Sequence, residues 1–372
     1  MSSTSHDVMI VGAGPAGATA AALLAGRSHS VVLIDKDRFP RGTSSLGWLS
    51  VKTDAVLQEI GVPQQSYGQS PFTDITFISG DFTKVVRPGV VDAPGYIVDR
   101  SAFNDILVKR AKKVGVVVKT GSDVIDIRSL EDSVVATLSD GSEVTARLLL
   151  LASGRTSPLP ESLGFTLPVR HARMWTAQID ATLEDDAYSG PPSVSVVLGL
   201  DRPGSFALCF LTPGRLSVSI NWLGERQETL TKLAYTCSGL FEKKISPVDL
   251  SSRITDLTLH GSPASAALDM DTHTGKHALL IGDAGGFVAA ASNEGIYPAM
   301  WSAQIASEVV EAALTSVRSQ DELMTFESKW RTTMADHLRP PNTDVQFLLP
   351  LVFSNQPMAD RMCSAFFSGE NI

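Results

Sequence analysis

The chain has 372 residues, of which 43% are hydrophobic and 19% charged, and its formal net charge is -9. This length suits two domains, and the composition predicts a globular rather than a disordered chain. The acidic balance argues against nucleic acid as a partner, because phosphate binding normally needs a basic face. Three widely spaced cysteines predict neither a disulfide framework nor a metal site, and are typical of a cytoplasmic protein. We expect no integral membrane segment and no signal peptide.

The N-terminal segment predicts a dinucleotide-binding turn. The apolar run Val8–Val11 reads as a buried strand, and Gly12, Gly14 and Gly17 follow it at Gly-x-Gly-x-x-Gly spacing. The first glycine permits a tight turn, and the second leaves room for a pyrophosphate. The third lets the following helix pack closely on the sheet.

The residues after this turn complete a dinucleotide-binding unit. A helix over Ala16–Leu24 would direct free N–H groups at the phosphates. A second strand, Val31–Ile34, leads to Asp35, whose carboxylate suits the hydroxyls of a ribose. The strand, helix, second strand and terminal acid together indicate a binding unit more strongly than three glycines alone.

Helical and strand patterns then alternate up to residue 151. We expect helices at Val51–Ile60 and Asp99–Val114, and strands at Ile75–Ile78, Thr83–Val86, Val116–Lys119, Val124–Ile127, Val134–Leu138 and Glu143–Leu151. Asp140-Gly141 predicts a hairpin between the last two strands.

Beyond residue 173 the pattern changes to consecutive strands. These are expected at Trp175–Leu183, Ser193–Leu198, Phe206–Leu211 and Leu216–Trp222. They predict an antiparallel sheet in a second domain inserted into the first. The chain returns to the first domain at Ala278–Ile281 and continues in helices at Gly295–Leu314 and Asp321–Asp336. The apolar tail Val345–Phe367 predicts a further helix that would cap a pocket.

A second glycine-rich segment carries the other half of the argument. Ala278–Phe287 contains a Gly-Asp pair at the end of an apolar run, and Ser292–Ile296 follows it. Together with the N-terminal turn, this pair of segments indicates FAD held from both ends.

Two further motifs support a family resemblance. They are Tyr96–Leu107, with its arginine, and Leu148–Ser157, with Ser153-Gly154. With these motifs the chain resembles FAD-dependent monooxygenases of the p-hydroxybenzoate hydroxylase type, whose fold is shared by flavin-dependent halogenases and geranylgeranyl reductases. The resemblance implies an α/β architecture: a Rossmann-like FAD-binding domain, an inserted antiparallel-sheet substrate domain and a helical C-terminus. The expected divisions are 1–73, 95–170 and 274–336 for FAD, 74–94 and 171–273 for substrate, and 337–372 for a C-terminal cap.

The resemblance also assigns cofactor-binding positions. Arg100 would reach the flavin and pyrophosphate, Asp283 would bind the ribityl chain, and Asn293 begins a helix whose amides face the flavin ring. The full expected set is Gly12, Gly14, Pro15, Ala16, Gly17, Asp35, Lys36, Arg41, Arg100, Val124, Ala152, Ser153, Gly154, Asp283, Asn293, Gly295 and Ile296.

The chain departs from the specialised branches of this superfamily. The Trp-x-Trp-x-Ile signature of halogenases is absent, and the stretch Pro40–Gly47 lacks the cysteine common in geranylgeranyl reductases. Lys84 lies roughly where halogenases carry a catalytic lysine, although a solvated lysine is the simpler interpretation.

Three acidic or basic side chains have alternative interpretations. Glu294 is a candidate acid or base, or else a helix-stabilising first-turn glutamate. His273 and His277 are four residues apart, but a turn and the lack of a third ligand argue against a metal.

The leading hypothesis is a monooxygenase that transfers oxygen from a flavin C4a-hydroperoxide to an electron-rich substrate, such as an aromatic compound or an indole. NAD(P)H or a separate flavin reductase would supply electrons transiently, because one dinucleotide unit is visible. Alternatives are a geranylgeranyl reductase-like enzyme, a halogenase, or a flavoprotein that modifies a tryptophan of a partner protein during quinone-cofactor maturation. Trp175, Phe206, Phe210 and Trp222 are candidates to line the substrate pocket.

Overall fold

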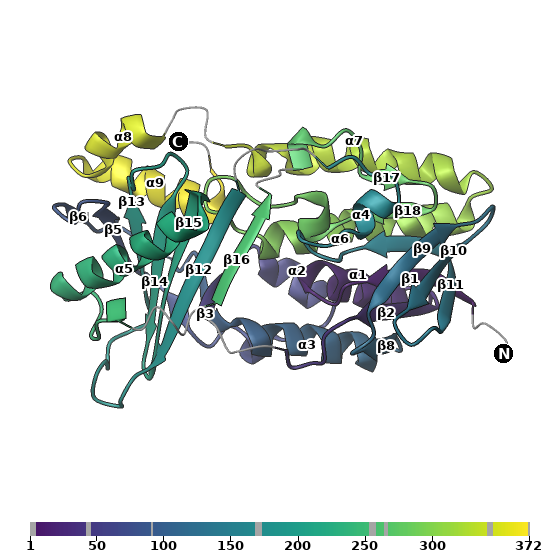
Figure 1. Cartoon of the computed structure of the whole chain (residues 1–372), viewed down its shortest axis with the longest axis horizontal. Helices are drawn as coiled ribbons and strands as arrows, with labels where there is room; N and C mark the ends of the chain where they lie inside the picture. The colour runs from purple at the N-terminus through teal and green to yellow at the C-terminus, as the bar shows by residue number, and fades with distance from the viewer. Residues whose placement is uncertain are drawn as a thin grey trace.

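Two large sheets lie at opposite ends of an elongated molecule (Figure 1). The computed structural model describes residues 5–41, 46–90, 92–167, 173–252, 258–263, 267–340 and 345–370. The middle of the Pro40–Gly47 stretch, residues 42–45, therefore lies outside the described part of the chain.

The eight-stranded sheet builds the dinucleotide-binding half. Its main path runs β17-β18-β11-β1-β2-β8, and the hairpin β9-β10 attaches to β11. The central pairs are parallel, so their carboxyl ends meet at one edge. The strands are β1 (Ser5–Val11), β2 (Val31–Asp35), β8 (Val117–Thr120), β9 (Val124–Ser129), β10 (Val134–Leu138), β11 (Glu143–Leu151), β17 (Thr274–Gly275) and β18 (Ala278–Leu280).

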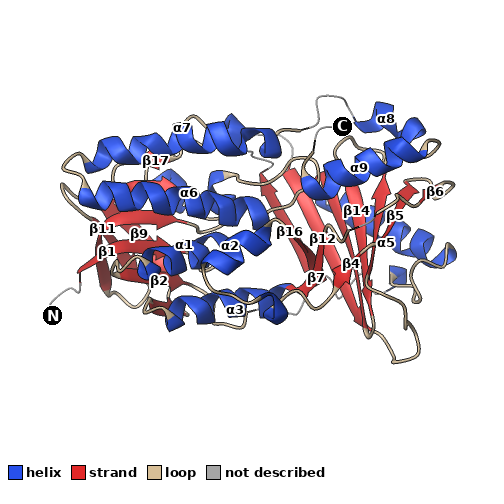
Figure 2. Ribbon diagram, turned by 180° about the vertical axis from the view of Figure 1, so that it is seen from behind, coloured by secondary structure: helices blue, strands red, loops and turns tan. Residues whose placement is uncertain are grey.

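Four helices stack beside this sheet, as Figure 2 shows: α1 (Pro15–Gly26), α3 (Arg100–Lys113), α6 (Ile296–Thr315) and α7 (Ser319–Leu338). The alanine-rich α1 is buried over nearly its whole length, because it is enclosed by the sheet and by α3 and α6. This arrangement packs the N-terminal glycine turn against the start of α6, although nearly 280 residues separate the two segments.

The seven-stranded sheet runs β16-β12-β15-β14-β13-β5-β6. All of its pairs are antiparallel except β13 with β5, which are parallel, so the expected antiparallel sheet is a mixed one. No hairpin links these two strands, which are more than a hundred residues apart, so their direction is unconstrained. The strands are β5 (Asp74–Ser79), β6 (Val85–Val86), β12 (Arg173–Thr182), β13 (Ser193–Leu198), β14 (Phe206–Thr212), β15 (Arg215–Gly224) and β16 (Thr258–Pro263).

Helices cover both faces of this sheet. On the outer face α5 (Arg226–Glu242) packs on apolar residues of β12, β14 and β15. On the inner face α9 (Gln356–Ser368) brings Phe366 and Phe367 onto an aromatic core that contains Trp48, Phe72 and Phe206. The expected C-terminal cap is thus two helices, α8 (Val345–Val352) and α9, of which α9 packs into this core.

Short elements connect the halves. A three-stranded sheet in the order β3-β7-β4 lies between them. The remaining elements are β3 (Leu46–Ser50), β4 (Pro71–Phe72), β7 (Gly95–Asp99), α2 (Thr53–Glu59), α4 (Leu159–Ser162) and the 3-10 helices at Gln64–Ser66, Ala267–Asp269 and Gly282–Gly285.

Most expected elements occur within a few residues of their predicted bounds. The helix α5 and the strands β3 and β7 were not predicted, because β3 and β7 are short and α5 has a mixed apolar pattern. Among the residues that the structure describes, no helix combines the length and apolarity that crossing a bilayer requires.

Candidate functional site

A cavity of about 610 Å³ opens at the carboxyl ends of β1, β2 and β11. Residues from both glycine-rich segments line it, together with residues of α3 and of the loop after β11. Every cofactor-binding residue expected from the sequence lies on its wall except Gly17. The structure therefore brings together residues from seven separate stretches of the chain.

The glycines of the first turn are required by close backbone approaches. Gly12 has a φ of +102°, and a Cβ placed there would lie 2.2 Å from the carbonyl oxygen of Ala152. A Cβ on Gly17 would lie 1.8 Å from the carbonyl oxygen of Gly12. Gly17 thus shapes the turn from behind, while the approach to Gly14 is open apart from the Arg41 side chain at 3.6 Å.

The second glycine-rich segment lies directly against the first. A Cβ on Gly282, whose φ is +59°, would lie 2.7 Å from the Cβ of Ala16. The 3-10 helix Gly282–Gly285 therefore presents Asp283 to the cavity beside the start of α1. The two glycine-rich segments, which the sequence motifs indicate as a pair, are therefore in direct contact.

Asp35 closes the cavity at the end of β2. Its buried carboxylate accepts hydrogen bonds from the backbone N–H of Ala13 at 2.6 Å and of Asp37 at 2.9 Å. Arg41 Nη1 lies 3.4 Å from the same carboxylate and 3.2 Å from the carboxylate of Asp37. Asp35 thus fixes the glycine turn and still borders the cavity.

Several polar atoms on the wall lack protein partners. Arg100 Nε, Asn104 Oδ1 and Ser153 Oγ are buried without a hydrogen bond within the described part of the chain. Burial lowers the pKa of Arg100, and Arg41 lowers it further, while Asp283 raises it. Unpaired buried polar groups are costly, so this wall suits a large ligand with anionic and hydroxyl groups.

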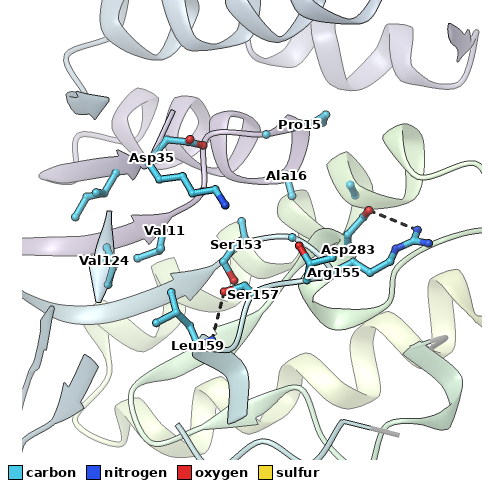
Figure 3. A pocket seen from close by; sticks show the side chains of 18 of the residues that line it. Val11, Pro15, Ala16, Asp35, Val124, Ser153, Arg155, Ser157, Leu159 and Asp283 are labelled. Carbon is cyan, nitrogen blue, oxygen red and sulfur yellow. Dashed lines mark hydrogen bonds and ion pairs between the residues drawn. The ribbon is translucent and has the colours of Figure 1, made fainter. Parts of the chain in front are cut away.

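Asp283 lies across the cavity from Asp35, as Figure 3 shows. Arg155 forms an ion pair with Asp283 at 3.5 Å, and both residues line the wall. The Asp283 side chain is 39% exposed, so it is available to a ligand's hydroxyl groups.

A buried histidine holds the Gly-Asp segment from behind. His273 is fully buried, its Nε2 lies 2.8 Å from the Gly285 carbonyl oxygen, and its Nδ1 lies 3.2 Å from Glu327. Burial raises the pKa of the Glu327 carboxyl, but its hydrogen bonds and electrostatic attraction to His273 outweigh this and lower it to about 2. His277 bonds instead to the Glu131 carbonyl oxygen, so the two histidines serve different contacts.

The loop before α6 connects the cavity to the seven-stranded sheet. Asn293 lines the cavity in a left-handed conformation with a φ of +54°. Its Nδ2 donates a hydrogen bond of 2.8 Å to Oδ1 of Asn221 on β15. Thr176 on β12 donates a second hydrogen bond to the same oxygen, at 2.9 Å.

Asn221 belongs to a row of polar side chains that the sequence argument missed. Three directly opposite pairs run along the inner face of β12 and β15: Thr176–Asn221, Gln178–Ser219 and Asp180–Ser217. We call these six residues the polar ladder. Alternation explains it, since the intervening Ala177, Ile179, Val218 and Ile220 face α5.

The far end of the polar ladder also leads back to the cavity. Gln178 donates to the Leu46 carbonyl oxygen at 2.9 Å, and the Leu46 N–H approaches Asp180 at 3.4 Å. A Cβ placed on Gly47, the next residue, would lie 2.9 Å from the Arg100 side chain. The ladder therefore extends between contacts to two cavity residues, Asn293 and Arg100.

Glu294 does not point into the cavity, although Asn293 and Gly295 on either side of it do. Its carboxylate is 3% exposed and lies 3.8 Å from Nε2 of His337 on α7. Burial raises the pKa of Glu294, and His337 partly counteracts this. The expected position beside the flavin face is thus corrected, because the backbone turns this side chain toward α7.

Two further sets of candidate residues lie away from the cavity. Lys84 is exposed and lines a separate groove with residues of α5 and α8. Trp222 is buried on the outer face against α5, and its partner in register, Trp175, shares that orientation. Phe206 and Phe210 do face inward, but they belong to the aromatic core beneath α9.

The cavity wall also contains residues that the sequence argument did not select: Asn104, Ser122, Asp123, Ile125, Arg155, Thr156, Ser157, Pro158, Leu159 and Ala299. Arg155–Ser157 directly follow Ser153-Gly154, so extending that motif by three residues would have predicted them. Asn104 is four residues after Arg100 on α3, on the same helix face.

Comparisons with known proteins agree with this geometry. A family model described as FAD binding domain matches residues 5–338. Menaquinone reductase of Mycobacterium tuberculosis is 28% identical over 334 residues, which cover 83% of this chain and 77% of that protein. Ubiquinone hydroxylase of Rhodospirillum rubrum is 31% identical over 169 residues, covering 42% of this chain and 39% of the hydroxylase.

The fold has solved counterparts. A geranylgeranyl bacteriochlorophyll reductase-like protein of Thermoplasma acidophilum superimposes with a TM-score of 0.72 at 19% identity. The superposition covers 99% of this chain and 92% of that one.

Proposed function

The chain belongs to the FAD binding domain family and is an FAD-dependent oxidoreductase, and we propose that it works as a monooxygenase on a polar, electron-rich substrate. Reduced FAD activates oxygen, which is the chemistry that the cofactor supplies when it is bound. The protein's contribution is to hold the cofactor, to position the substrate and to exclude water from between them.

We assign FAD to the 610 Å³ cavity. Free N–H groups at the start of α1 would face the pyrophosphate, with Arg100 as the cation. Asp35 would accept hydrogen bonds from the adenosine ribose, and Asp283 from the ribityl chain. The unpaired Arg100 Nε and Ser153 Oγ support this assignment, because a ligand there would provide their missing partners.

The same proposal divides the chain into two functional parts. Residues 1–73, 95–170 and 274–336 would hold FAD, and residues 74–94 and 171–273 would cover the substrate. The pairing of β5 and β6 with the strands of the second part supports this division. Residues 337–372 would complete the aromatic core of the substrate part through α9.

The polar ladder is the observation that supports the proposed class of substrate. It presents hydroxyl, amide and carboxylate groups on the sheet face that contacts the cavity loop at Asn293. The ladder members on β15 are buried, whereas Thr176, Gln178 and Asp180 on β12 are partly exposed and so are the ones a substrate could reach. A substrate that offers a hydrogen-bonding group, such as the hydroxyl of a phenol or the N–H of an indole, fits this face better than an isoprenoid chain.

A second candidate function is the reduction of a carbon–carbon double bond. One observation favours it: the likeness to menaquinone reductase covers most of both chains. A protein side chain as substrate remains compatible with the same ladder.

Rapid mixing of the chemically reduced holoprotein with oxygen tests the leading proposal. A transient absorbing species before oxidised flavin returns would support oxygen transfer. Direct return to oxidised flavin, together with anaerobic conversion of menaquinone by the reduced holoprotein to a product with one carbon–carbon double bond fewer, would support the reductase instead. Anaerobic mixing with NADH, NADPH or a flavin reductase would identify the electron donor.

A further inference from the structure

His273 holds the Gly-Asp segment at both of its ends. Its backbone carbonyl oxygen accepts a hydrogen bond of 2.9 Å from the N–H of Leu280, at the end of β18. Its ring Nε2 lies 2.8 Å from the carbonyl oxygen of Gly285, the last residue of the 3-10 helix Gly282–Gly285. A Cβ placed on Gly285 would lie 3.0 Å from Cδ2 of the same ring. Asp283 therefore lies between two attachments to one histidine.

Both ring nitrogens of His273 face hydrogen-bond acceptors. A carbonyl oxygen can only accept, so Nε2 carries a proton and donates it to Gly285. Nδ1 lies 3.2 Å from Oε2 of Glu327, which also accepts from the backbone N–H of His273 at 3.1 Å. The other carboxylate oxygen, Oε1, accepts from Nε of Arg331 at 2.7 Å. Donors at both oxygens stabilise the ionised carboxylate, so the proton between the two side chains lies on Nδ1.

Three aromatic side chains enclose this ion pair. The ring centroids of Phe287 and Trp330 each lie 4.9 Å from that of His273, and the centroid of Phe326 lies at 6.4 Å. The histidine is fully buried, so the attraction between its ring and the carboxylate is stronger than at the surface. Burial raises the pKa of the Glu327 carboxyl, but the hydrogen bonds and charge of His273 outweigh this and lower it to about 2.

We propose that His273 is an imidazolium cation at neutral pH and acts as a positioning residue, whose two ring N–H groups fix Asp283 for the ribityl chain of FAD. The charge makes both donors available, because a neutral imidazole has only one N–H. Glu327 on α7 holds the ring on one side, and the ring holds the Gly-Asp segment on the other. This inference rests on the proposed placement of FAD in the cavity, and not on which reaction the flavin catalyses.

Nitrogen NMR of the FAD-bound protein, labelled with isotope-enriched histidine, tests the charge. The two ring nitrogens of an imidazolium have similar chemical shifts, whereas those of a neutral imidazole are far apart. The signals of His273 are identified as those that disappear in the variants His273→Phe and His273→Gln. We expect the imidazolium pattern in the wild type and in Glu327→Asp. Glu327→Gln removes the anion that balances the proton, and should show the neutral pattern.

Two ligands distinguish positioning from a general loss of structure. FAD would contact Asp283, whereas ADP, the adenosine and pyrophosphate part of the cofactor, would bind at the glycine turn and Asp35. His273→Phe keeps a ring within the aromatic cluster but has no N–H. We expect it to weaken FAD binding by about tenfold or more and ADP binding by less than about twofold. His273→Gln keeps one donor group and should lie between this variant and the wild type. Isothermal titration of the FAD-free proteins measures both dissociation constants.

The matched control is His277→Asn. His277 lies four residues further along the chain, and its Nε2 bonds to the Glu131 carbonyl oxygen, away from the Gly-Asp segment. Its φ is +58°, a conformation that asparagine tolerates. This variant should bind FAD and ADP as the wild type does.

Three results would overturn the inference: neutral-pattern signals for His273 in the wild type, wild-type FAD affinity in both His273 variants, or an equal loss of FAD and ADP affinity in them. Arg100→Met judges the placement of FAD separately. Unchanged FAD affinity in that variant would contradict the placement itself, whatever the charge of His273.

Discussion

Asn293 Nδ2 donates to Asn221 Oδ1 at 2.8 Å, and this hydrogen bond joins the cavity loop to the seven-stranded sheet. Asn293 is left-handed, with a φ of +54°, a conformation that asparagine tolerates better than most residues. Asn221 is 5% exposed, so its carbonyl oxygen has little access to water as an alternative partner. The contact therefore fixes the position of the polar ladder relative to the cavity loop.

Asn221→Ala should loosen this connection. Two donors, Asn293 Nδ2 and Thr176 Oγ1, would lose their acceptor, at a cost of about 1–3 kcal/mol in unfolding free energy. Because Asn293 lines the cavity, the FAD dissociation constant should rise as well. The matched control is Thr176→Val, which removes one donor and leaves the asparagine pair intact, so its FAD affinity should stay near that of the wild type. Equal FAD affinities in the two variants would contradict this role.

Arg100→Met should separate cofactor binding from folding. The Arg100 Nε is buried without a protein partner, so the charge of Arg100 adds little to the stability of the apoprotein, whereas bound FAD would pair with it. We expect FAD affinity to fall by about tenfold or more, while the unfolding free energy of the apoprotein stays level or rises. Arg110→Met should instead leave the FAD affinity unchanged and lower the unfolding free energy of the apoprotein. The reason is that Arg110 Nε donates to the Ile60 carbonyl oxygen, away from the cavity. Isothermal titration with FAD and urea unfolding of both apoproteins provide the comparison.

The cavity wall was predictable because its chemistry is local. The glycines allow close approaches of the backbone, and Asp35 ends a strand. Each of these features recurs at a fixed spacing in the sequence. Arg155 was missed although it follows the Ser153-Gly154 motif, since pairing with Asp283 depends on a contact across 128 positions.

The inner face of the seven-stranded sheet, which we propose as the substrate face, was not predictable in the same way. The alternation of β12 was visible, but which of its two faces meets the cavity depends on where α5 packs, and α5 was not expected. Glu294 shows the same limit on a smaller scale. Its place between two cavity residues was correct, but the side-chain direction follows from a left-handed Asn293 that no spacing reveals.

Alanine substitutions at three glycines should have opposite effects within one segment. Gly12→Ala and Gly17→Ala place a Cβ 2.2 Å and 1.8 Å from backbone oxygens, so both should abolish FAD binding and lower stability by several kcal/mol. Gly26→Ala, at the exposed end of α1, meets no atom within 4 Å and should raise stability by about 0.5–1 kcal/mol. Thermal unfolding with and without FAD distinguishes these outcomes, and a tolerated Gly17→Ala would contradict the geometry of the turn.

Acid should weaken the protein through Glu327. The pKa of this carboxyl falls from 4.5 to about 2 on folding, so its stabilising effect is complete above pH 4.5 and is lost as the pH falls toward 2. Glu327→Gln should therefore be less stable than the wild type at neutral pH, by about 2–3 kcal/mol, and the difference should shrink in acid. Urea unfolding across this range measures it. Glu308→Gln, an exposed change on α6, should show the wild-type pH dependence.

Glu294 should show the reverse dependence. Burial raises its pKa above 4.5, so ionisation of this carboxyl opposes folding, and the cost grows as the pH rises through the folded-state pKa. Glu294→Gln should be more stable than the wild type at high pH, with the gap closing as the pH falls. The Glu308→Gln control should show no such gap. If Glu294 only positions the loop before α6 and transfers no proton, Glu294→Gln should keep its activity while its melting temperature shifts. An activity loss without any change in the pH dependence of stability would instead assign Glu294 a direct chemical role, despite its direction toward His337.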